Sequence, residues 1–130
     1  CVAIGGRAVI IDGPSGSGKS SLALALIDRG AQLIGDDGVT LEQRDGTLWA
    51  APPPNIEGKL EIRNVGIVEL PSVTAPVSLS LMLDSAAPRY IDEAETAELA
   101  GYALPLVRLW PESPVLALRA EWALRTYGLR

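Results

Sequence analysis

The chain has 130 residues, of which 48% are hydrophobic and 21% charged, and this balance is typical of a single globular domain, which we expect over residues 1–130. A net charge of −5 argues against nonspecific binding to nucleic acid, and no apolar run approaches the roughly 18 residues of a membrane span, so we expect a cytoplasmic protein without membrane or nucleic-acid partners. The lack of histidine and the single cysteine exclude histidine acid–base catalysis, an internal disulfide and a multi-cysteine metal site.

The N-terminal part of the chain is expected to form two strands and a helix. Strands at 2–4 and 8–11 should pair as a hairpin, because a glycine turn separates them. Residues 19–28 are good helix formers and are apolar on nearly every side, so this helix should pack against a sheet. Gly30 is expected to end the helix as a C-terminal cap.

The connection between the second strand and the helix carries the most informative motif. It follows the phosphate-loop pattern G-x-x-x-x-G-K-[ST] through Gly13, Pro14, Ser15, Gly16, Ser17, Gly18, Lys19 and Ser20. Glycines let backbone N–H groups surround a phosphate, and the following helix N-terminus favours an anion. We expect this loop and Ser21 to bind a nucleoside triphosphate, with Lys19 at the β- and γ-phosphates and Ser20 as a Mg²⁺ ligand. The alternative is a chance match, a glycine-rich turn beside a surface lysine.

The middle of the chain is expected to consist of short strands. A strand at 32–34 precedes an acidic pair, and an Asp-Gly turn should join strands at 39–43 and 47–51. The prolines at 52–54 require a loop, because proline cannot donate to a central strand. Further strands are expected at 60–63, 66–70, 77–83 and 104–109.

A second helix is expected near the C-terminus. Ser113 and Pro114 are typical of an N-cap followed by proline at the first helical position, and Gly128 should end the helix. The core-facing side of this helix should consist of Leu116, Ala120, Ala123 and Tyr127. The acidic segment 92–99 is expected to be a further short helix with a solvated face.

Asp36 and Asp37 follow the strand at 32–34 directly. Near a nucleotide, one carboxylate can orient or deprotonate an attacking hydroxyl, and the other can hold Mg²⁺ directly or through water. The alternative is an ordinary turn, because the sequence Gly-Asp-Asp-Gly has favourable turn chemistry. The residues alone leave both interpretations open.

Three segments together resemble the catalytic domain of the HPr kinase/phosphorylase family. In that family a helix ending in R-G follows the phosphate loop, a strand ending in D-D comes next, and a signature close to E-I-R-G-x-G-I follows. The matching segments here are 26–30, 33–37 and 56–67. The likeness covers residues 1–70 in detail and corresponds to a short form without the family's N-terminal domain. Asn64 stands where the family has glycine, and asparagine tolerates the same left-handed backbone.

The resemblance implies a fold and an activity. The fold is an α/β phosphate-loop nucleotide-binding domain with mixed sheets, similar to that of phosphoenolpyruvate carboxykinase. The activity is transfer of the γ-phosphate of ATP to a serine of HPr, the phosphocarrier of the sugar phosphotransferase system, and its removal by phosphorolysis. Such an enzyme regulates carbon and nitrogen metabolism. Family members are commonly hexamers, so a homo-oligomer is expected.

The resemblance also implies roles for individual residues. Asp36 would activate the acceptor's serine hydroxyl, or phosphate in the reverse reaction, and Asp37 would assist together with Lys19 and the metal. Mg²⁺ would be held by Ser20 and by one glutamate of the signature, Glu61 in preference to Glu57. Arg63 would position the phosphates or the signature loop. The alternative for Glu61 and Arg63 is a cross-strand pair on the surface.

Two other functions stay open at this point. A small-molecule kinase would need an enclosed acceptor pocket and an arginine-rich lid, but the arginines of this chain are scattered. A nucleotide-sensing module with decayed catalysis is favoured by two departures from the family, a missing histidine before the first strand and a missing C-terminal Gly-Arg-Asn stretch. The acidic pair argues against a sensor, because a protein that only binds nucleotide needs no base.

Overall fold

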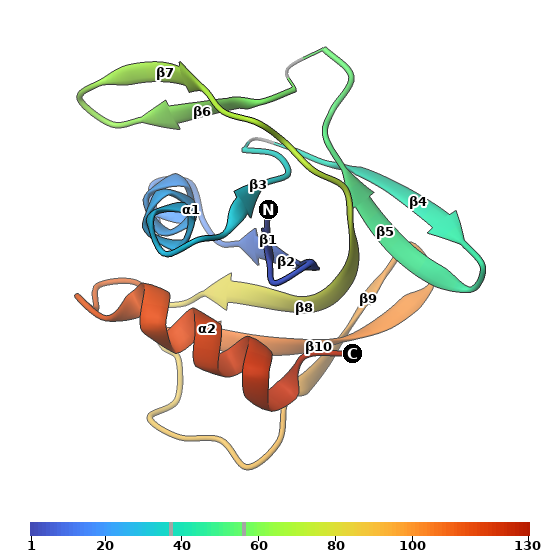
Figure 1. The fold of residues 1–130 in the computed structure, drawn as a ribbon. Helices are drawn as coiled ribbons and strands as arrows, with labels where there is room; N and C mark the ends of the chain where they lie inside the picture. The colour runs from blue at the N-terminus through green and yellow to red at the C-terminus, as the bar shows by residue number, and fades with distance from the viewer. Residues whose placement is uncertain (37, 56) are drawn as a thin grey trace.

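The structure is a computed structural model that describes residues 1–36, 38–55 and 57–130, and it consists of two helices against a curved sheet (Figure 1). The main sheet has the strand order β3 (Gln32–Leu33), β1 (Val2–Ile4), β2 (Arg7–Asp12), β8 (Ala75–Leu83), β10 (Tyr102–Leu109) and β9 (Glu95–Leu99). The three central strands β2, β8 and β10 run parallel, and the outer strands pair antiparallel. The mixed α/β architecture expected from the sequence is therefore confirmed.

Two hairpins extend this sheet. β4 (Thr40–Arg44) and β5 (Thr47–Ala51) form the first, which joins the sheet where Trp49 pairs with Pro76 at the start of β8. β6 (Lys59–Ile62) and β7 (Gly66–Glu69) form the second, which pairs with no other described strand. Figure 1 shows β8 curving from the first hairpin to the centre of the sheet, and the second hairpin standing over α1.

Both helices lie on one face of the sheet and contact each other there. α1 (Lys19–Asp28) buries Leu22 and Leu26, and α2 (Leu116–Tyr127) buries Ala120 and Leu124 in the same apolar cluster. An ion pair between Arg29 and Glu121, with 2.9 Å between nitrogen and oxygen, links the two helices at the surface. Among the residues that the structure describes, no helix is both long and apolar enough to cross a membrane.

The other face of the sheet carries a second apolar cluster. Side chains alternate along a strand, so Val2 and Val9 face the helices whereas Ala3 and Ala8 face this second cluster. The β4–β5 hairpin covers it with residues that include Leu48. The sheet is therefore buried on both sides at its centre, which holds the strand ends near the candidate site in fixed positions.

The parallel strands bring the glycine-rich loop to one edge of the sheet. β2 ends at Asp12, which pairs with Met82 of β8, and the loop starts at the next residue. A Cβ atom on Gly13 would lie 3.1 Å from the Cβ of Leu83 and 2.7 Å from the Oγ of Ser17, so only glycine fits between these neighbours. Ligands of open α/β sheets bind at the carboxyl ends of the strands, and the loop lies at that edge.

The prediction of a helix at 92–99 is wrong, because Glu95–Leu99 forms the edge strand β9, which pairs antiparallel with β10. Ala100 and Gly101 connect the strands with φ values of 51° and 83°, which is typical of a two-residue hairpin turn. Pairing with β10 is a contact between strands that outweighs the helical preference of the acidic segment.

The C-terminal helix begins later than expected, at Leu116 rather than at Pro114. Ser113 does not cap the helix. Its Oγ instead accepts a hydrogen bond from the N–H of Val115 at 3.1 Å, which builds a turn ahead of the helix. The expected end is confirmed, because the helix stops at Tyr127, before Gly128.

Leu26 offers a test of this packing. Its side chain is fully buried beneath the sheet, so Leu26→Ala should lower the free energy of unfolding by about 3 kcal/mol through lost apolar contact and the cavity left behind. Leu118 lies on α2 with 38% of its surface exposed, and Leu118→Ala should cost no more than about 0.5 kcal/mol. Urea denaturation of both variants measures the difference, and equal losses would contradict the packing described.

Candidate functional site

A cavity of about 690 Å³ opens between the glycine-rich loop, the start of α1 and the β6–β7 hairpin. The loop and helix contribute Ser15, Gly16, Gly18, Lys19, Ser20 and Ser21 to its lining. The hairpin contributes Glu61, Ile62, Arg63, Asn64, Val65 and Gly66. The cavity therefore joins the loop that the motif singled out to the signature segment, which lies about forty residues further along the chain.

The backbone of the loop is open toward this cavity. Gly16 and Gly18 have φ values of 78° and 96°, which other L residues rarely adopt, and a Cβ on either would meet no atom within 4 Å. No side chain among the described residues caps α1 at Gly18, so the N–H groups of its first turn are available to an anion. Pro14 and Ser17 do not line the cavity, and a hydrogen bond within the loop joins them, from the Ser17 N–H to the Pro14 carbonyl at 3.1 Å.

Lys19 places a positive charge in the loop. Its Nζ donates a hydrogen bond to the carbonyl oxygen of Gly13 at 2.9 Å and is partly buried. The amine thus stays close to the loop backbone and lines the cavity, where it can neutralise an anion held by the N–H groups.

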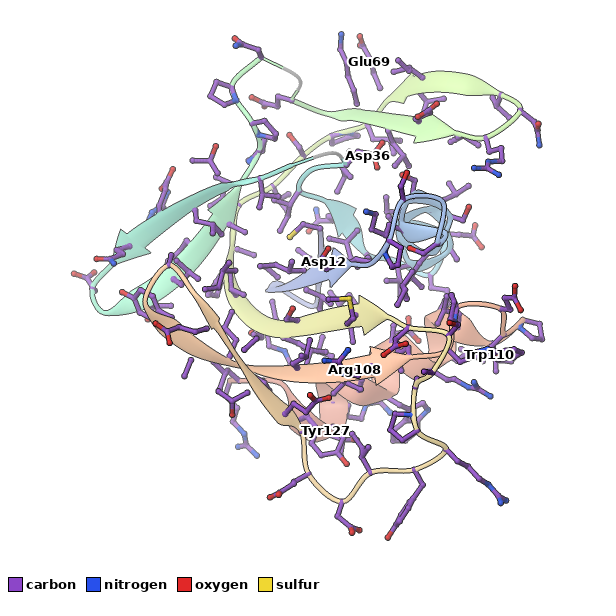
Figure 2. All side chains as sticks on the ribbon, turned by 180° about the vertical axis from the view of Figure 1, so that it is seen from behind. Asp12, Asp36, Glu69, Arg108, Trp110 and Tyr127 are labelled. Carbon is purple, nitrogen blue, oxygen red and sulfur yellow. The ribbon has the colours of Figure 1, made fainter. Side chains whose placement is uncertain are left out.

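Asp36 connects the start of α1 to the β6–β7 hairpin. Its Oδ1 accepts a hydrogen bond from Ser20 Oγ at 2.6 Å, and its Oδ2 accepts one from the backbone N–H of Glu61 at 3.0 Å. Figure 2 shows Asp36 beneath the hairpin, and Asp12, the last residue of β2, further from the hairpin in the same view. The carboxylate therefore links both walls of the cavity, through one hydrogen bond from each wall.

The hairpin places Glu61 and Arg63 in the cavity lining but not Glu57, which instead accepts a hydrogen bond from Ser72 Oγ at 3.4 Å. Asn64 has a φ of 72°, so the prediction that asparagine keeps the left-handed turn is confirmed. Asp37 lies outside the described residues. The sequence missed Ile62 and the turn residues 64–66 as lining residues, although the signature segment that contains them was the available signal.

The donor set near Ser20 suits a hard cation. The serine hydroxyl and the Asp36 carboxylate adjoin each other, and such oxygens are the protein ligands that Mg²⁺ prefers. Within the part of the chain that the structure describes, no three acidic or cysteine side chains gather into a metal site. Mg²⁺ usually keeps several waters and phosphate oxygens beside one or two protein ligands, so the residues present fit it together with a nucleotide.

The openness of the loop can be tested with a matched pair of glycines. Gly16 and Gly101 have similar φ values, 78° and 83°, and open space around the missing Cβ, so Gly16→Ala and Gly101→Ala should lose similar stability, about 1 kcal/mol. Only the Gly16 methyl would project into the cavity, and it should weaken ATP binding about tenfold or more. Calorimetric titration measures this. Equal ATP affinity of the two variants would contradict the expectation that the glycine-rich loop binds the nucleotide.

Comparison with known proteins places the chain in a family. The model of the HPr Serine kinase C-terminal domain matches residues 1–76. HPr kinase/phosphorylase of Streptococcus thermophilus is 37% identical over 122 residues, covering 83% of this chain and 40% of the relative. HPr kinase/phosphorylase of Clostridium botulinum is 43% identical over 83 residues, covering 64% of this chain and 26% of the relative.

A solved structure agrees over nearly the whole chain. The Hpr(Ser) kinase/phosphatase from Coxiella burnetii has a TM-score of 0.84 and 31% sequence identity, covering 95% of this chain and 84% of that one. The chain spans 40% or less of the length of these curated relatives. More than half of the chain matches the family model, and the fold agrees with that of the Hpr(Ser) kinase/phosphatase. The chain therefore belongs to the HPr serine kinase C-terminal domain family.

Proposed function

We propose that this chain is a catalytic domain that transfers the γ-phosphate of ATP to a serine of an HPr-type phosphocarrier protein and reverses the transfer by phosphorolysis. The observation that carries the proposal is the position of Asp36, whose carboxylate bonds the Ser20 hydroxyl and the Glu61 amide at the loop cavity. Family membership supports the acceptor. The proposal includes a phosphate-loop fold related to phosphoenolpyruvate carboxykinase and, by family resemblance, a hexamer.

The loop would bind the triphosphate of ATP. Residues 13–21 offer backbone N–H groups and the uncapped start of α1, which suit phosphate oxygens. The Lys19 amine would neutralise charge that develops on the transferred group. Arg63 lines the opposite wall of the cavity and would orient the phosphates from that side.

Ser20 and Asp36 would hold Mg²⁺, with Glu61 as a further oxygen ligand at the hairpin. A Mg²⁺ ion held by these residues would supply positive charge to offset that of the phosphates. The contact between Ser20 and Asp36 orients both oxygen donors before any ligand arrives. The same carboxylate holds the backbone of Glu61, so the metal ligands and the hairpin wall are positioned together.

We propose a role for Asp36 that differs from the one expected from the sequence. Its Oδ1 adjoins the hydroxyl of Ser20, the expected Mg²⁺ ligand, and each carboxylate oxygen accepts one described hydrogen bond, so each keeps a second lone pair that could bind a cation. We therefore assign Asp36 to the metal side of the reaction. The sequence assigns hydroxyl activation to Asp36 with Asp37 assisting, so in this proposal that role moves to Asp37, which lies outside the described residues.

The test is transfer of label from γ-labelled ATP, with Mg²⁺, to the HPr-type protein of the same organism. We expect label on one serine of the acceptor and none when that serine is replaced by alanine. ATP binding without label on any acceptor serine would overturn the kinase proposal and favour a nucleotide-sensing module. A small-molecule kinase would instead leave the protein acceptor unlabelled while consuming ATP with a small acceptor.

A further inference from the structure

The tip of the β6–β7 hairpin exposes two apolar side chains. Val65 is 71% exposed in the turn and Ile67 is 70% exposed on β7. Asn64 and Gly66 on either side of Val65 have φ values of 72° and 127°, so two left-handed residues fix the direction of the turn. Because both side chains belong to a hairpin that lines a cavity, they are candidates for an interaction surface.

The fold does not require these two side chains to be apolar. The hairpin is held on the protein by its inward side, where Leu60 is fully buried and Val68 packs partly against the main core. Ile67 is paired with Glu61 and alternates with Val68 along β7, so it faces away from that core. Replacing it with a polar residue removes no core contact.

The position of the two residues at the cavity limits what can cover them. Val65 lines the cavity, whereas Ile67 lies outside its lining. A nucleotide contained in the cavity can touch Val65, but a ligand that covers both side chains must extend beyond the cavity rim. A protein that presents a serine to the cavity has to contact the rim of the cavity, because its surface around the serine is far wider than a nucleotide, and the hairpin forms one side of that rim.

We propose that Val65 and Ile67 form an apolar contact for the acceptor protein, against an apolar side chain next to its phosphorylated serine. This inference rests on the proposed function and names the surface that its substrate uses. Asp36 gives the contact a fixed place relative to the phosphate loop, because it ties the Glu61 backbone, opposite Ile67 in the hairpin, to Ser20 of α1. Side chains that become fully buried near the centre of a protein interface can carry a large share of its binding energy.

The test compares Val65→Ser and Ile67→Ser with Leu118→Ser, which removes an exposed apolar side chain from α2, outside the cavity lining. Steady-state kinetics give the KM for the acceptor and the KM for ATP, and light scattering gives the oligomeric mass. For Ile67→Ser we expect the acceptor KM to rise about tenfold, while the ATP KM, the mass and the melting temperature stay at wild-type values. Leu118→Ser should leave the acceptor KM within about twofold of wild type.

Each other outcome overturns the inference in a recognisable way. An unchanged acceptor KM in Ile67→Ser, with an active wild type, refutes the contact but leaves the kinase intact. A rise in the ATP KM alone assigns these side chains to the nucleotide base, and a lower oligomeric mass assigns them to contacts between copies of the chain. A wild type that binds ATP but labels no acceptor refutes the proposed function and the contact together.

Discussion

Lys19→Ala should lower kcat/KM for phosphoryl transfer about 10³-fold, the scale of losing one preorganised charged donor in an active site. The Nζ of Lys19 lies 2.9 Å from the Gly13 carbonyl inside the loop, and the described residues place no other lysine or arginine on the loop side of the cavity. Removing the amine therefore takes away the one positive side chain that the described residues place on the loop side of the proposed phosphate site. Initial rates of label transfer at varied ATP concentration measure the change.

The chain offers a matched control for this variant in its other lysine. Lys59 is exposed on β6 and does not line the cavity, so Lys59→Ala should stay within about twofold of the wild-type rate. Lys19 makes one described hydrogen bond, to a backbone carbonyl, so its loss should leave the melting temperature nearly unchanged. A Lys19→Ala enzyme that kept a tenth or more of the wild-type kcat/KM would refute the role of the loop.

Asp36→Asn should lower transfer by about 10²-fold or more, because the charge that balances the cation is lost. The amide oxygen can still accept from the Glu61 N–H, and its NH₂ group can face Ser20, whose hydroxyl can turn to accept. The fold should therefore survive while the negative charge disappears. The Mg²⁺ concentration for half-maximal rate should rise about tenfold or more, which a magnesium titration of the transfer rate measures.

Asp45 supplies the control for this substitution. It occupies the exposed β4–β5 turn with a φ of 50°, a conformation that asparagine tolerates as well as aspartate. Asp45→Asn should leave both the rate and the magnesium dependence at wild-type values. If Asp36→Asn lost activity but kept the wild-type magnesium dependence, Asp36 would not act on the metal side and the hydroxyl-activating role would return to it.

The sequence predicts correctly those parts of the fold that depend on residues close to one another along the chain. Helix α1 begins and ends where its composition and Gly30 indicate, and the glycine-rich loop lies at the end of β2 as its motif requires. The sequence predicts a helix at 92–99, whereas Glu95–Leu99 forms β9, because the preference of this segment for β structure comes from pairing with β10 and not from its own residues. Ser113 was predicted to cap α2, yet it closes a separate turn before Leu116.

The candidate site, too, could be predicted from the sequence only where its residues carry a local signal. The loop residues carry their own signal, since consecutive glycines and a lysine have few structural uses. The hydrogen bond from the Glu61 backbone to Asp36 joins residues 25 positions apart, and no spacing rule predicts such a contact. The resemblance to a family supplied Glu61 and Arg63, but the exposure of Val65 and Ile67 at the cavity rim required the three-dimensional structure.

A crystal structure of the chain with a nonhydrolysable ATP analogue and Mg²⁺ tests the central claim most directly. The account predicts the β- and γ-phosphates in the cavity between the glycine-rich loop and the β6–β7 hairpin. It places them within hydrogen-bond distance of Lys19 and of the backbone N–H groups of the loop, with the cation at Ser20 and Asp36. Phosphates bound away from this cavity, or a cation without contact to Ser20 and Asp36, would contradict it.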